Sequence, residues 1–208
     1  MKTLELFSGT KSFSKVAKEL GHETITVDND ESLDPDLLGS VLDILPTAEM
    51  LKGKDVIWAS PPCQGFSVAV IGRNWNRDYT PKTDSARLAM KLAIKTIQLI
   101  EIAQPKYWFI ENPRGMLRKM PFMEELLRRS GGVRHTVTYC QYGDTRQKPT
   151  DIWTNCLEWI PKPMCKPGAS CHVAAPRGSK TGTQGLKGAK ERGVIPSNLF
   201  REIFKSII

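Results

Sequence analysis

Short apolar segments rich in β-branched and aromatic residues alternate with helical patterns through about residue 155 of the sequence. This alternation is what a parallel sheet with crossover helices requires. Strands are expected over residues 3–7, 24–27, 56–59 and 107–110, with an alternating edge strand over 135–140 that pairs antiparallel. Helices are expected over residues 13–20, 85–103 and 123–129. The sequence therefore predicts an α/β fold built on a doubly wound, mostly parallel sheet of the Rossmann-like kind.

The length of 208 residues leaves room for one domain with its own core, over residues 1–208. A hydrophobic fraction of 40% and a charged fraction of 25% are typical of a soluble globular chain. No apolar run approaches the roughly 20 residues that a membrane helix needs, and the first residues lack the apolar core of a signal peptide. We therefore expect a cytoplasmic protein with no membrane partner.

The chain is basic, with 30 lysine and arginine residues against 22 acidic residues and a net charge of +8. This balance favours a polyanionic partner, with nucleic acid as the leading candidate and a merely solvated positive surface as the alternative. Five cysteines are an odd number in a chain without an export signal, where thiols stay reduced. Disulfides are therefore not expected.

Residues 160–195 differ in character from the rest of the chain. Prolines are followed there by closely spaced glycines and by many basic residues. This composition is too rich in glycine for a regular helix and too basic for a core segment. We expect a basic loop, with regular structure returning only at residues 196–207.

The end of the first expected strand carries a small residue and a glycine, Ser8 and Gly9. A glycine at that position lets the backbone turn tightly and approach a ligand at the switch point of a doubly wound sheet. Asp28 follows 19 residues later, at the end of the next strand, where a carboxylate can accept hydrogen bonds from the ribose of an adenosine-containing cofactor. Asp43 is a further acidic candidate. A turn of this kind is also common in α/β proteins of many functions.

Two prolines precede Cys63, directly after the strand expected at residues 56–59. They fix the chain and hold the thiol outside the carboxyl edge of the sheet, which favours a reactive cysteine. The alternative is a small buried hydrophobic residue, the usual state of a free cysteine.

Glu111 occupies the same position at the end of the strand expected at residues 107–110. Because the ends of parallel strands face one cleft, its carboxylate could share a proton with a substrate bound near Cys63. The alternative is the first residue of a helix, with Asn112 and Pro113 as a stop signal.

These motifs, in this order, resemble the DNA cytosine-5 methyltransferase family over roughly residues 3–155. Residues 6–9 are similar to its cofactor loop, residues 61–64 to its nucleophile motif and residues 111–113 to its catalytic glutamate motif. Tyr142 and Gly143 look like the start of a later, arginine-bearing motif, and residues 195–203 resemble the final cofactor-side segment. The resemblance implies a class I S-adenosylmethionine-dependent methyltransferase.

The family's chemistry would make Cys63 the nucleophile that attacks C6 of a flipped-out cytosine in DNA, while Glu111 binds the N3 edge. Arg146 is the best candidate for contacting the base or its phosphate. S-adenosylmethionine would be bound by Phe7, Ser8, Gly9, Asp28, Asn29, Asp43 and Pro62.

The sequence also departs from the family. Thr10, Lys11 and Ser12 stand where more glycine is usual, and one arginine of the later motif is displaced. The long target-recognition region is replaced by residues 160–195, so the chain looks most like phage or prophage members, some of which serve restriction-modification. We expect recognition of a short or loose site, with Thr183 and Gln184 as candidate base readers, or an accessory specificity protein.

Cys156, Cys165, Cys171 and His172 are a possible tetrahedral zinc set, but the spacing lacks a Cys-x-x-Cys knuckle. We favour unliganded thiols and expect no metal.

Two other functions remain open. A branch of the same family methylates tRNA with a similar Pro-Pro-Cys-Gln loop. The chain could also be a catalytically idle DNA-binding homologue, against which the intact Cys63 and Glu111 argue.

Overall fold

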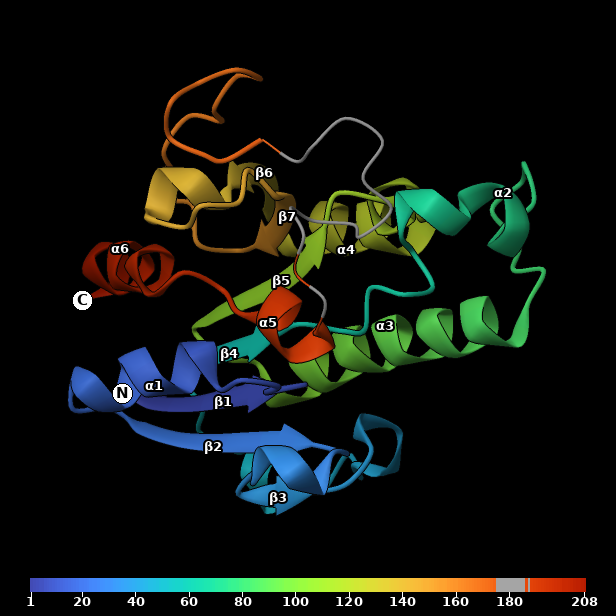
Figure 1. Cartoon of the computed structure of the whole chain (residues 1–208). Coiled ribbons are helices and arrows are strands. Elements are labelled where there is room, and N and C mark those ends of the chain that lie inside the picture. Colours follow the sequence, from blue (N-terminus) through green and yellow to red (C-terminus); the bar gives the residue numbers. More distant parts are fainter. Residues whose placement is uncertain (175–185, 187) are drawn as a thin grey trace.

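The computed structural model describes residues 1–174, 186 and 188–208, and these form a seven-stranded sheet with helices on both faces (Figure 1). The strand order is β3-β2-β1-β4-β5-β7-β6. The strands are β1 (Lys2–Leu6), β2 (Glu23–Asp28), β3 (Leu37–Leu38), β4 (Val56–Ala59), β5 (Tyr107–Pro113), β6 (Val133–Thr138) and β7 (Pro149–Thr154). Neighbours from β3 to β5 pair parallel, whereas β7 is antiparallel to both β5 and β6. The predicted doubly wound, mostly parallel sheet is confirmed.

Six α-helices lie within the described part of the chain. They are α1 (Ser12–Glu19), α2 (Ile71–Asn74), α3 (Asp84–Ala103), α4 (Pro121–Ser130), α5 (Ala189–Gly193) and α6 (Ser197–Ile207). In Figure 1, α1 and α6 lie on one side of the sheet, and α3 on the other. None of the helices in this part of the chain is both long and apolar enough to cross a bilayer.

Alternate residues of the central strands supply two separate cores. Ile57 and Ala59 of β4 belong to the core that includes α3 and α4, whereas Val56 and Trp58 belong to the core that includes α1 and α6. This is the period-two alternation of a strand that is buried on both faces. The Trp58 ring lies 5.7 Å from the ring of Phe13 in α1, and burial of an aromatic side chain contributes about 1.5–3 kcal/mol.

The predicted elements 3–7, 24–27, 56–59 and 85–103 lie within one residue of observed strands and helices. Two further segments differ. The strand expected over 107–110 continues to Pro113, because β7 pairs with its second half and places Ile152 opposite Glu111. The edge strand expected over 135–140 ends at Thr138, and the 3₁₀ helix η6 (Tyr139–Tyr142) follows.

The expectation that residues 160–195 contain no regular structure is wrong for their last part, where α5 forms. Its stability comes from residues far away in the sequence. The carbonyl oxygens of Glu191 and Arg192 accept hydrogen bonds from the Arg146 guanidinium, and Lys148 also donates to the Arg192 carbonyl. These donors satisfy carbonyls that a short helix leaves free at its end.

Candidate active site

The ends of β1, β4 and β5 bring the three sequence motifs to one edge of the sheet. Leu6 is paired with Ala59, and Ala59 is paired with Ile110. The residues that follow these three positions, Phe7, Ser60 and Glu111, therefore leave the parallel part of the sheet side by side. The predicted cofactor loop, nucleophile loop and glutamate share this edge, as the ends of parallel strands must.

The loop that carries Cys63 is held from several sides. Asn112 Nδ2 donates a 2.7 Å hydrogen bond to the Pro61 carbonyl, and Trp75 Nε1 donates a 2.8 Å bond to the Gly65 carbonyl. A Cβ at Gly65 would lie 2.3 Å from the Ala89 Cβ of α3, so only glycine allows this close packing. The half-buried Cys63 is thus presented by a loop with little freedom to move.

The Cys63 thiol is in an environment that disfavours its ionised form. Burial raises its pKa above the ordinary value, and the negative charge of Glu111 raises it further. The positive charges of Lys148 and Arg192 act in the opposite direction. In the free protein the thiol form is therefore favoured at neutral pH.

Glu111 is 5% exposed and is oriented by one specific neighbour. The hydroxyl of the buried Tyr139 donates a 2.9 Å hydrogen bond to Glu111 Oε1. Burial raises the pKa of the Tyr139 hydroxyl well above its usual value, so this group stays a donor. Tyr139 thus fixes one oxygen of the carboxylate and leaves Oε2 for other partners.

Lys148 is a site residue that the sequence reasoning missed. Its ammonium lies 4.8 Å from the centre of the Tyr139 ring and donates a 2.9 Å hydrogen bond to the Arg192 carbonyl. Burial lowers its pKa, and the charges of Glu111 and Cys63 oppose that effect. Only the antiparallel pairing of β7 with β5 brings Lys148 to these two residues, and β7 was not among the predicted strands.

Arg146 is buried, and its guanidinium donates to groups of the protein itself. It pairs with Asp144 and donates to the carbonyls of Glu191, Arg192 and Val194. These contacts account for all three guanidinium nitrogens. Contact with the base or its phosphate stays a prediction, and in this conformation Arg146 holds α5 against the sheet edge.

The predicted cofactor loop has a strained and specific backbone. Phe7 and Gly9 have positive φ angles of 56° and 48°. Gly9 N donates a 2.8 Å hydrogen bond to Asp28 Oδ2, and Asp30 N donates a 3.0 Å bond to Asp28 Oδ1. Asp28 therefore braces the loop, and further hydrogen bonds from a ribose would use the remaining lone pairs of its oxygens.

The loop also offers groups suited to a nucleoside-type cofactor. Within the described residues, the buried Ser8 Oγ has no hydrogen-bond partner. Asn29, Asp43 and Pro62 are exposed. An orphaned hydroxyl and exposed amide and carboxylate groups fit a ligand that carries ribose hydroxyls and an amino acid.

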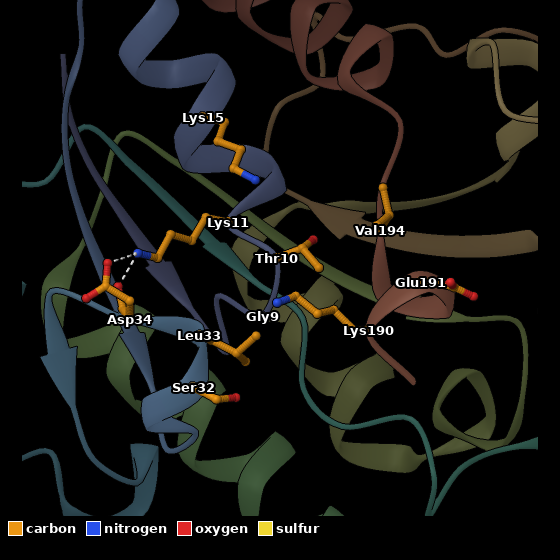
Figure 2. A pocket seen from close by; sticks show the side chains of 10 residues that line it. All are labelled: Gly9, Thr10, Lys11, Lys15, Ser32, Leu33, Asp34, Lys190, Glu191 and Val194. Atoms are coloured by element: carbon orange, nitrogen blue, oxygen red, sulfur yellow. Dashed lines mark hydrogen bonds and ion pairs between the residues drawn. The ribbon is translucent and has the colours of Figure 1, made fainter. Parts of the chain in front are cut away.

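A cavity of about 470 Å³ opens beside this loop, between the start of α1, the 3₁₀ helix η1 (Glu31–Leu33) and α5. Figure 2 shows Lys11, Lys15 and Lys190 around it, with Lys11 bonded to Asp34. Of the predicted cofactor residues, Gly9 lines this cavity. Its volume lies in the usual range for small-molecule sites.

The cysteines lie differently from the possible zinc set that the sequence offers beside the favoured interpretation of unliganded thiols. Cys156 Sγ lies in a separate buried position, 3.6 Å from Glu158 Oε2, and its backbone N–H donates to Thr154 Oγ1. The set of Cys156, Cys165, Cys171 and His172 is therefore wrong in one member. Cys140 of η6 takes the place of Cys156 beside the other three.

Comparisons with known proteins identify the family of this chain. Residues 40–126 match the family model described as C-5 cytosine-specific DNA methylase. The chain is also 33% identical over 177 residues to the "Probable DNA (cytosine-5)-methyltransferase" of Frog virus 3, an alignment that covers 82% of this chain and 78% of that protein.

Solved structures show the same architecture. Entamoeba histolytica methyltransferase EhMeth matches with a TM-score of 0.56 and 13% identity over 74% of this chain and 52% of its own. A provisionally named DNA modification methyltransferase encoded within prophage Cp of E. coli matches with a TM-score of 0.53 and 20% identity over 74% of this chain and 46% of its own.

The chain thus spans about half the length of these solved structures. At such identities the likeness concerns the fold, which is the Rossmann-like fold of class I methyltransferases. The family model and the viral relative establish more than the fold: the chain belongs to the C-5 cytosine-specific DNA methylase family.

Proposed function

We propose that this protein transfers a methyl group from S-adenosylmethionine to C5 of cytosine in DNA, through a covalent bond between Cys63 and a flipped-out base. The observation that carries the proposal is the placement of Cys63 and Glu111 at one sheet edge, close enough for the charge of Glu111 to raise the pKa of the thiol. A nucleophile and an acid-base group in one cleft are what this reaction needs.

Cytosine C5 becomes nucleophilic only after something adds across the 5,6 double bond. The Cys63 thiolate forms a bond to C6, while Glu111 gives a proton to N3 and so stabilises the enamine. S-adenosylmethionine, when bound, supplies the electrophilic methyl group that C5 takes. Loss of the C5 proton and release of Cys63 from C6 then restore the double bond, and N3 returns its proton to Glu111.

The opposed charges around Cys63 suggest where its proton goes. Glu111 raises the pKa of the thiol, so protonation of Glu111 removes that effect. Transfer of the thiol proton to the carboxylate, directly or through water, yields a thiolate and a neutral carboxylic acid. These are the two states that attack at C6 and proton donation to N3 require.

We place the cofactor over Phe7, Ser8 and Gly9. The ribose is assigned to Asp28, with Asn29, Asp43 and Pro62 as further contacts. The unpartnered Ser8 Oγ and the braced turn at Gly9 support this assignment. Arg146 is assigned a positioning role, because its guanidinium donates to two carbonyls of α5 and to the Val194 carbonyl that follows it.

DNA is the proposed substrate of a single domain over residues 1–208 that carries a net charge of +8. The basic segment 160–195 would contact phosphates in place of a target-recognition domain. Arg177, Lys180, Thr183, Gln184 and Lys187 of this segment lie outside the described residues. Arg201 pairs with Glu19 on α1, and Lys190 lines the cavity beside the cofactor loop, so neither is assigned to DNA.

The proposal is tested by measuring methyl transfer from radiolabelled cofactor to three substrates in parallel: duplex DNA, single-stranded DNA and tRNA. Duplex DNA should be labelled most, and the Glu111→Gln variant serves as the matched inactive control. Labelling of tRNA in preference to either DNA would favour the RNA-modifying branch. If none of the three is labelled, although the protein binds both the cofactor and DNA, the chain would be an idle homologue.

A further inference from the structure

Three thiols and an imidazole converge away from the catalytic edge. Cys140 lies in η6, directly after β6, and Cys165, Cys171 and His172 lie in the segment that follows β7. One sulfur or nitrogen atom from each residue lies within 4.8 Å of all the others. Neither the catalytic mechanism nor the cofactor loop uses any of these side chains.

Three of the four distances below are those of the edges of a metal-centred tetrahedron, and the fourth is shorter. The Cys140 sulfur lies 3.2 Å from that of Cys165 and 3.6 Å from that of Cys171. The His172 Nδ1 lies 3.6 Å from the sulfurs of both Cys165 and Cys171. Tetrahedral zinc with ordinary zinc–sulfur and zinc–nitrogen bonds gives edges of roughly 3.5–3.8 Å. We propose that Cys140, Cys165, Cys171 and His172 bind one Zn²⁺ ion.

Hydrogen bonds around the cluster hold its members in this arrangement. The Cys165 backbone N–H donates a 2.9 Å bond to Thr138 Oγ1, which attaches the segment to the end of β6. Gln141 Nε2 donates to the Cys171 sulfur at 3.4 Å. Outer contacts of this kind orient metal ligands.

A tight turn returns the chain from Cys165 to Cys171. Ala169 N donates a 3.2 Å hydrogen bond to the Lys166 carbonyl, and Gly168 has a φ of 82°, which favours glycine. Two ligands that are six positions apart in the sequence are thereby brought together without a Cys-x-x-Cys knuckle. The turn explains why the ligand spacing resembles no common zinc motif.

The ligand chemistry selects the metal and its role. Three thiolates and one imidazole suit zinc and exclude magnesium and calcium, which take oxygen ligands. Four protein ligands leave no open position for water or substrate, so the site is structural.

After the fully buried Trp159, apolar packing does little to hold the segment that carries these ligands. Ile160 is 83% exposed and Val173 is 63% exposed. Val173 N nevertheless donates a 2.9 Å hydrogen bond to the Thr145 carbonyl, next to Arg146. A bound ion would attach this segment to η6. It would thereby fix the position at which the following basic stretch of the sequence begins.

Metal analysis of the full chain, purified without chelators and then dialysed against zinc, tests the site. We expect about one zinc per chain, as one four-ligand site requires. The Cys165→Ser, Cys171→Ser double variant should lose that zinc. The Cys156→Ser variant is the matched control and should retain it, because Cys156 lies outside the cluster. Less than about a tenth of an equivalent in wild type, or equal zinc in the double variant, would overturn the proposal.

A second test replaces zinc by cobalt in the wild-type protein, so its main result does not depend on whether a variant folds. Cobalt bound here should show the intense visible bands of tetrahedral thiolate coordination, and His172→Cys should retain the metal with shifted bands. Weak octahedral bands would contradict the site. So would a disulfide between Cys140 and Cys165, found by mass spectrometry in protein isolated under reducing conditions. None of these readouts depends on methyl transfer, so they stand apart from the proposed function.

Discussion

At the scale of single residues, Tyr139 and Lys148 surround Cys63 and Glu111, the two groups that exchange a proton in the proposed reaction. Tyr139 donates to one oxygen of Glu111, and Lys148 supplies a positive charge near both residues. Neither residue forms a bond to the substrate in the proposed mechanism. Both are positioning residues, and their removal should alter rate or pH dependence and leave the fold intact.

Tyr139→Phe removes the hydroxyl that orients Glu111. A hydrogen bond to a charged group contributes about 1.5–3 kcal/mol, so the single-turnover rate should fall roughly ten- to a hundredfold. Tyr142→Phe is the matched control, because that hydroxyl donates to Glu202 and not to Glu111. Equal rates in the two variants would show that Glu111 does not depend on Tyr139.

Lys148→Met removes a cation that lowers the pKa of Cys63. Burial and Glu111 already raise this pKa, so the rate of thiol alkylation should increase with pH, and the variant's profile should lie at higher pH than that of wild type. Alkylation by iodoacetamide, followed by mass spectrometry of the Cys63 peptide, measures both profiles. Lys162→Met, a lysine over the Tyr142 ring, is the control. A Lys148→Met profile that is unchanged or lies at lower pH would contradict the assignment.

At the scale of elements, α1 begins without a side-chain cap of its own. Glu5 of β1 caps the helix instead. Its carboxylate accepts hydrogen bonds from the backbone N–H groups of Phe13 and Ser14 and from the Ser14 hydroxyl. The strand therefore stabilises the start of the helix that follows the cofactor loop. Burial raises the pKa of Glu5 to about 7, despite these donors.

This pKa predicts a pH dependence of stability. The folded state binds the Glu5 proton more tightly than the unfolded state, whose value is 4.5, so the free energy of unfolding falls as pH rises between 4.5 and about 7. The loss is on the order of 3 kcal/mol. Urea unfolding of wild type and Glu5→Gln at several pH values should show this decline in wild type alone. Parallel declines would mean that Glu5 is not its source.

The sequence predicts elements well where the signal is local. The strand at Val56–Ala59 is continuous and apolar. The long helix α3 ends at Ala103 and is followed by Gln104, in the left-handed conformation, and by Pro105. The extension of β5 and the strand β7 escape such reasoning, because they depend on pairing with each other. The short helix α5 depends on Arg146, which lies more than forty residues earlier.

The site follows the same rule. Cys63 and Glu111 could be placed together, because parallel strands end at one edge. The position of Lys148 beside them could not be predicted in this way, because it requires β7 to run antiparallel to β5. The metal ligands could be identified only in part: which cysteine joins the pair of Cys165 and Cys171 depends on where η6 lies, and this makes Cys140, not Cys156, the partner.

At the scale of the whole molecule, the proposed binding of DNA depends on the net charge of +8. Phosphate contacts provide affinity and positioning but carry no base information. We therefore predict a methylated site of only about two to four base pairs. Bisulfite sequencing of a plasmid methylated by the purified protein measures it. A long, strictly defined site would refute loose recognition, and methylation only after addition of a second protein would assign specificity to a partner.

The proposed reaction passes through a covalent bond between Cys63 and the base, and a 5-fluorocytosine substrate can trap this intermediate. Duplex DNA with 5-fluorocytosine cannot lose its C5 substituent as a proton, so after methyl transfer the bond from Cys63 to C6 should persist through denaturing electrophoresis. Wild type with S-adenosylmethionine should form this adduct, and peptide mapping should place it on Cys63. The Cys63→Ser variant should bind the cofactor and form no adduct. An adduct that persists in Cys63→Ser, or maps to another cysteine in wild type, would contradict the account.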